Sequence, residues 1–155
     1  MSSYSEQTNW RGRISRYAPL LLWIALIFFL SSNLGAANNT SRIIRPLLLW
    51  LFPDITEPSI QTVHFLVRKG AHVTAYGMLG FWAFRAFRRS AVDVLRRGRF
   101  IFSLLLVSLI AITDETNQSY LASRTGSPWD VALDTSAGLT VILIFYLYEK
   151  YRQRI

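Results

Sequence analysis

The chain has 155 residues, which is enough for one domain and hardly for two. It contains no Cys, so disulfide frameworks, thiolate zinc sites and cysteine nucleophiles are excluded. Hydrophobic residues make up 52% of the chain and charged residues only 17%, yet the formal net charge is +8. Such a chain is either a membrane protein or a nucleic-acid binder, and the positions of the basic residues decide between the two.

Four apolar segments are long enough to cross a bilayer, which takes about 20 residues. They lie at about 17–37, 62–87, 100–118 and 129–148. Small residues at 35–37 resemble a signal-peptide cleavage site, but the first run is long for a signal peptide, so we expect a retained span. The segments must be helices, because lipid offers the backbone no hydrogen-bond partner and the runs lack the alternation of barrel strands. Residues 43–52 are too short to cross and suit an interfacial or re-entrant segment.

Most of the 17 Lys and Arg residues flank the termini and the connection between the second and third segments. Because cytoplasmic loops are rich in basic residues, both termini should face the cytoplasm. We therefore predict one all-α domain over residues 1–155, a four-helix bundle that crosses the cytoplasmic (inner) membrane several times. The basic excess is accounted for by topology, so we expect membrane lipid as a partner and no nucleic acid.

Ionisable residues gather at the outer ends of three segments, where they are costly and usually functional. Lys69, His72 and Tyr76 share one face of the second segment. The third segment carries Asp114, Glu115 and Gln118. The fourth carries Asp130, Asp134 and Gly138 at intervals of four residues, and Arg124 lies in the connection before it.

The start of the fourth helix is predicted at Ser127 and Pro128. Ser127 is placed as the N-cap and Pro128 at the first helical position. An acid in the first turn favours a helix, so Asp130 also has a purely capping role available. In an antiparallel packing, the polar faces of the three segments converge just below the outer surface.

Two interpretations of this convergence stay open. Charge pairs could simply lock the helices together, because polar groups also hold membrane helices together. Alternatively, the residues line an outward-facing pocket in which Asp114 or Glu115 acts as an acid or base with His72 as its partner. A metal site needs a third ligand at bonding distance, and nothing in the residue spacing places one there. We therefore predict neither a metal nor another cofactor. Gly138 is expected to allow close helix packing.

These residues resemble the VanZ-like family of membrane proteins, which is associated with teicoplanin resistance. The matching pieces are Ser31-Ser32, Arg68-Lys69-x-Ala71-His72 with Tyr76, Asp114-Glu115-x-x-Gln118, Arg124, and Asp130-x-x-x-Asp134-x-x-x-Gly138. Ala75, Asn117 and Ser123 stand where the family often has Glu, His and Gly. The resemblance implies an integral membrane protein with a role in the cell envelope and reduced teicoplanin susceptibility. It does not supply a reaction.

Three functions follow from the sequence as hypotheses. The leading one is a pocket that binds a lipid, a lipid-linked envelope precursor or a glycopeptide-related ligand. In it, Arg68, Lys69 and Arg124 supply the positive charge, while Asp114, Glu115 and Gln118 orient the ligand opposite His72 and Tyr76. Asp130 and Asp134 are further ligand-binding candidates, and His72, Asp114 and Glu115 are the catalytic candidates if the protein is an enzyme. The second hypothesis is an intramembrane enzyme acting on such a lipid. The third is a structural subunit that binds a partner protein. The sequence does not indicate an oligomeric state.

Overall fold

The computed structural model describes residues 10–32, 37–120 and 126–154. Within these ranges every regular element is an α-helix, so the all-α prediction is confirmed for this part of the chain. The helices are α1 (Trp10–Ser31), α2 (Ala37–Leu51), α3 (Glu57–Arg88), α4 (Asp93–Arg97), α5 (Arg99–Ser119) and α6 (Pro128–Arg152). Helices α1, α3, α5 and α6 correspond to the four predicted segments and extend beyond them, except that α1 ends at Ser31 rather than at residue 37.

The helix ends follow local chemistry. At the start of α6, the side chain of Ser127 accepts a hydrogen bond from the backbone N–H of Trp129, and Pro128 is the first helical residue, which confirms the predicted cap. Lys150 and Arg152 lie in the last turn of α6, where cations favour the helix dipole. At the end of α1, the hydroxyl of Ser32 donates to the carbonyl of Phe29.

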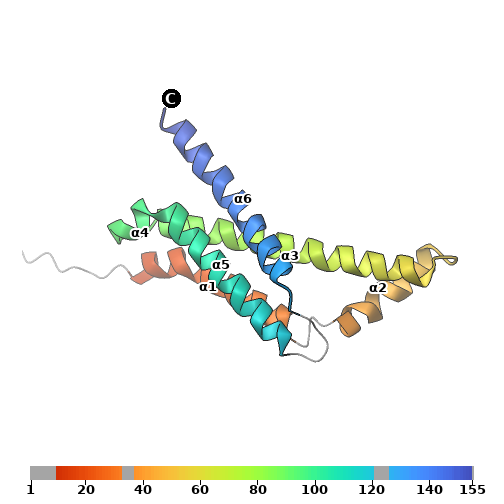
Figure 1. The fold of residues 1–155 in the computed structure, drawn as a ribbon. Coiled ribbons are helices and arrows are strands. Elements are labelled where there is room, and N and C mark those ends of the chain that lie inside the picture. Colours follow the sequence, from red (N-terminus) through yellow and green to blue (C-terminus); the bar gives the residue numbers. More distant parts are fainter. Residues whose placement is uncertain (1–9, 33–36, 121–125, 155) are drawn as a thin grey trace, which may run out of the picture.

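The long helix α3 is the centre of the fold. It packs against α1, α2, α5 and α6, while α5 also packs against α1 and α6. Figure 1 shows α6 crossing α3 and continuing past it, with α1 and α5 on the opposite side of α3 from the free end of α6. Helix α2 lies along the first part of α3.

The α3–α6 crossing is closest at Gly80 and Gly138. A Cβ atom on Gly80 would lie 2.6 Å from the carbonyl oxygen of Gly138, and one on Gly138 would lie 2.6 Å from a methyl group of Val107. Small residues allow this approach of helix backbones, as is common in membrane bundles. The apolar core surrounds the crossing and includes Leu79 and Ile142.

Three helices, α1, α5 and α6, are long and apolar enough to cross a membrane, and each exposes large apolar side chains. The protein is therefore a multi-pass membrane protein. Helix α3 does not meet the same criterion, and it carries Arg68, Lys69 and His72 within its length. Residues 43–51 belong to α2, which at 15 residues is too short to cross and exposes Ile43 and Trp50.

Candidate functional site

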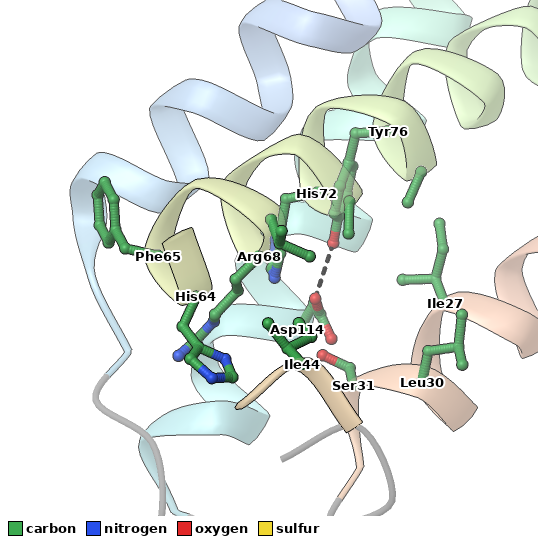
Figure 2. A pocket seen from close by; sticks show the side chains of 13 residues that line it. Ile27, Leu30, Ser31, Ile44, His64, Phe65, Arg68, His72, Tyr76 and Asp114 are labelled. Carbon is green, nitrogen blue, oxygen red and sulfur yellow. Dashed lines mark hydrogen bonds between the residues drawn. The ribbon is translucent and has the colours of Figure 1, made fainter. Parts of the chain in front are cut away.

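A cavity of about 380 Å³ opens between α1, α2 and α3, with one residue of α5 at its inner end. Its apolar wall includes Ile27 and Leu30 of α1 and Ile44 of α2. Arg68, His72, Tyr76 and Asp114 also line it, together with Ser31, His64, Phe65, Val67, Ala71 and Ala75. Figure 2 shows the side chains of His72, Tyr76 and Asp114 converging at one end of the cavity. The cavity therefore combines an apolar wall with a polar end.

One hydrogen-bonded network joins five side chains of α1, α3 and α5 near the polar end. The hydroxyl of Tyr76 donates to Asp114 Oδ2 over 3.1 Å, and Gln118 Nε2 donates to the same oxygen over 3.0 Å. Gln118 Nε2 also lies 2.7 Å from Ser31 Oγ, and Arg68 Nη2 donates to Gln118 Oε1 over 3.1 Å. Since Asp114 and Gln118 are one helical turn apart on α5, a single face of that helix meets both α1 and α3.

A second set of contacts joins α3 and α5 to the start of α6. His72 Nδ1 and Asp134 Oδ2 lie 3.1 Å apart. Glu115 Oε2 accepts a hydrogen bond of 3.0 Å from the backbone N–H of Ser127. One ligand atom each of His72, Glu115 and Asp134 lies within 4.8 Å of the other two, so these three residues form a compact group.

Lys69 and Asp130 form an ion pair at the rim of the cluster. Both side chains are mostly buried, with 25% and 14% of their surface exposed. Asp130 therefore has a cationic partner as well as its place in the first turn of α6.

The acids deeper in the cluster are less well satisfied. Asp114, Glu115 and Asp134 are 1%, 4% and 0% exposed, and each keeps one carboxylate oxygen without a hydrogen-bond partner. Within the described ranges, no Lys or Arg forms an ion pair with any of them. Because native structures satisfy nearly all buried polar groups, such oxygens point to a partner outside the described residues.

The structure brings together the predicted residues of all three helices and places Gly138 at the helix crossing. Arg124 lies outside the described residues. The specific partners could not be derived from spacing: His72 contacts Asp134 rather than Asp114 or Glu115. Sequence reasoning also did not assign Ile44 or His64 to the cavity. Ser31 was singled out only through the family resemblance, and here it contacts Gln118.

Ala75 links α3 to α1 through its backbone. Its carbonyl accepts a hydrogen bond of 2.8 Å from the indole N–H of Trp23, which fixes α1 on α3 at the wall of the cavity. Position 75 therefore adds no acid to the cluster, whose acidic residues are Asp114, Glu115, Asp130 and Asp134.

A model of the VanZ/LLP1 family matches residues 17–149. The chain belongs to the VanZ/LLP1 family. The matched range contains every described residue of the cavity and the polar cluster, so the site lies within the family domain. No curated protein and no solved structure matches the chain.

Proposed function

We propose that this VanZ/LLP1-family protein lies in the cytoplasmic membrane and binds the anionic headgroup of a lipid or lipid-linked envelope precursor. The observation that supports this function is the cavity with two chemically different sides. Ile27, Leu30 and Ile44 offer an apolar surface for hydrocarbon, while Arg68 and His72 lie at its polar end. A phospholipid or polyprenyl phosphate presents the same combination of hydrocarbon and charge.

The proposal includes α3 as a fourth membrane span. Its 32 residues correspond to about 48 Å at 1.5 Å per residue, more than the roughly 30 Å of a hydrocarbon core. The polar side chains of its middle section contact α5 and α6, as expected for ionisable residues inside a membrane. The interruption of its apolar sequence is therefore compatible with a span.

The basic residues support an orientation with both termini in the cytoplasm. Arg96 and Arg97 lie in α4, between α3 and α5, and Arg99 begins α5, on the same side as the two termini in a four-span topology. The polar cluster then faces the outer surface. A reporter fused to the C-terminus should be active only in the cytoplasm, and a reporter that is active outside would reject this orientation.

Arg68 is the residue we assign to the anionic headgroup. Lys69 is already paired with Asp130, whereas Arg68 donates to the neutral amide of Gln118. A guanidinium has five N–H donors in a planar fork that matches phosphate oxygens. Arg68 therefore retains donors for a ligand while Gln118 holds its orientation.

Lipid binding by the purified full-length protein tests this assignment. Native mass spectrometry would compare retention of phosphatidylglycerol with that of zwitterionic phosphatidylcholine. We expect Arg68→Gln to lower the preference for the anionic lipid about tenfold, which corresponds to about 1.4 kcal/mol. Arg154→Gln, which removes an exposed charge near the C-terminus, is the matched control and should keep the preference. An unchanged preference in Arg68→Gln would reject the assignment.

We further propose that binding of an envelope precursor reduces susceptibility to teicoplanin. Cells that lack the protein should then need less teicoplanin for growth inhibition than cells given back the wild type. Equal inhibitory concentrations in the two strains would reject a role of this protein in teicoplanin susceptibility. They would leave the lipid-binding proposal unaffected, because that proposal is tested on the purified protein.

The second candidate function is an intramembrane enzyme that acts on the bound lipid. The contact between His72 and Asp134 favours it, because a carboxylate that orients one imidazole nitrogen prepares the ring for proton transfer. Glu115 or Asp114 would supply the other acid or base. In this case Glu115→Gln should abolish conversion of the lipid while the purified variant still binds it. Loss of binding in that variant would favour the simple binding function.

A further inference from the structure

We propose that His72, Glu115 and Asp134 form a binding site for a divalent transition-metal cation, with Zn²⁺ as the preferred ion. The three residues come from α3, α5 and α6, and one ligand atom of each lies within 4.8 Å of the other two. This juxtaposition depends on the helix packing and has no counterpart in the spacing of the sequence. It goes beyond the proposed lipid binding and does not depend on it.

The unpartnered oxygens are the independent observation that points to a ligand. Asp134 is fully buried and Glu115 is 4% exposed, yet Oδ1 of Asp134 and Oε1 of Glu115 have no hydrogen-bond partner in the part of the chain that the structure describes. Burying a carboxylate oxygen without a partner is costly. A cation between the two carboxylates would satisfy both oxygens at once.

The charges around the group favour the same conclusion. Lys69 is engaged by Asp130, and Arg68 donates to Gln118. Across the described ranges, the only basic side chain in contact with Glu115, Asp134 or the neighbouring Asp114 is the imidazole of His72. Among the described residues, this buried group of three carboxyls therefore has at most one positive partner, and a divalent cation would supply the missing charge.

The ligand types select the class of metal. Imidazole suits zinc and other transition metals, whereas Mg²⁺ and Ca²⁺ prefer oxygen ligands alone. One His and two carboxylates make three protein ligands and leave a fourth position for water or substrate, as catalytic zinc sites do. Ligand atoms of a tetrahedral zinc ion lie about 3.4 Å apart, given bonds of about 2.1 Å, so the three side chains need to close by roughly an ångström.

Metal binding needs a neutral imidazole at His72 and ionised carboxylates at Glu115 and Asp134. His72 also lines the cavity, so the ion would lie beside the space that the lipid headgroup occupies. A direct contact between the ion and a lipid phosphate rests on the proposed function, but metal binding by itself does not.

The test uses the full-length protein without a histidine tag, purified in detergent, treated with chelator and then titrated with Zn²⁺, Mn²⁺ or Mg²⁺. Bound metal is measured by mass spectrometry, and affinity by competition with a chromophoric chelator. We expect one equivalent of Zn²⁺, weaker Mn²⁺ binding and no stoichiometric Mg²⁺ binding. His72→Gln, Glu115→Gln and Asp134→Asn should each weaken Zn²⁺ binding at least about tenfold, the size of effect that even indirect contacts to a metal ligand have.

Glu149→Gln is the matched control, because Glu149 lies on α6 but pairs with Arg99 far from the three ligands. It should bind Zn²⁺ as the wild type does. Wild-type protein that takes up no stoichiometric Zn²⁺, or uptake that survives in all three folded ligand variants, would overturn the proposal. If the variants do not fold, X-ray absorption of the zinc-loaded wild type decides: one imidazole with oxygen ligands supports the site, and a shell without imidazole rejects it.

Discussion

The crossing of α3 and α6 at Gly80 and Gly138 divides the bundle into two halves of opposite chemistry. On the side toward Arg88, the helices pack through apolar residues such as Ala83 and Ile142, and an aromatic pair joins Phe100 to Tyr146. On the other side, the same helices bring buried acids together around His72. Both halves adjoin the close contact between Gly80 and Gly138. Among the described residues, only the half around His72 contains carboxylate oxygens without a hydrogen-bond partner.

This difference bears on why the acids are present. The apolar half and the glycine contact already provide close packing of α3, α5 and α6. Hydrogen bonds between membrane helices contribute modestly, about 0.6 kcal/mol on average, and unpartnered buried carboxylates oppose folding. Packing alone therefore does not require the acidic half, and a ligand-related role explains it better than a purely structural one.

The largest expected effect on stability comes from adding a side chain where the backbones of α3 and α6 meet. In Gly80→Ala the added Cβ would lie 2.6 Å from the backbone oxygen of Gly138, so the helices must separate. We expect a loss of about 1 to 3 kcal/mol in the free energy of unfolding, the usual range for overpacking. Unfolding in detergent by heat or by increasing dodecyl sulfate would measure it.

Gly77→Ala is the control for this change on the same helix. Its Cβ would meet only Val141, at 3.4 Å, which is ordinary van der Waals contact. Because Ala favours a helix over Gly, this variant should be as stable as the wild type or more so. Equal losses from the two substitutions would show that the crossing is not the point that organises the bundle.

The next effect compares the ion pairs of the two halves. Lys69–Asp130 in the acidic half and Arg99–Glu149 in the apolar half are buried to a similar degree. We expect Asp130→Asn and Glu149→Gln each to cost about 1 kcal/mol, because both pairs keep some contact with solvent. Adding Lys69→Met to Asp130→Asn should cost less than the sum of the single changes. Strictly additive costs would mean that the pair contributes no mutual attraction.

The smallest effect on stability is expected at the buried acids that keep one carboxylate oxygen without a hydrogen-bond partner among the described residues. Asp134→Asn keeps the shape of the side chain but removes a buried charge that lacks a cationic partner other than His72. In metal-free protein we expect unchanged or increased stability, within about 1 kcal/mol, as is common when a strained functional site is relaxed. Unfolding measured in the presence of chelator provides the comparison, and a loss above that size would support the helix-locking interpretation instead.

The sequence predicts much of this architecture, because helical periodicity determines which residues share a face. Asp114 and Gln118 lie on one face of α5. Asp130, Asp134 and Gly138 lie on one face of α6. The spacing of these residues is therefore enough to predict that the polar faces come together. The cap at Ser127 is equally local, and the structure confirms it. The charge distribution and hydropathy likewise indicate a membrane protein.

The individual partners were not predictable, since they depend on how the helices cross. Spacing alone leaves open whether His72 contacts Asp114, Glu115 or Asp134, and the structure shows the contact with Asp134. The cavity also includes Ile44 of α2 in its lining, and nothing in the sequence places this short segment beside α3. The group of His72, Glu115 and Asp134 therefore emerges only in three dimensions.

The central claim is that the acidic half serves a ligand rather than helix packing. An envelope-lipid profile by mass spectrometry tests it, with cells lacking the protein given back wild type, Glu115→Gln or Glu149→Gln at equal membrane abundance. We predict that deletion changes a lipid, that wild type and Glu149→Gln restore it, and that Glu115→Gln does not. Restoration by Glu115→Gln as complete as by the wild type would contradict the claim and assign the buried acids to holding the helices together.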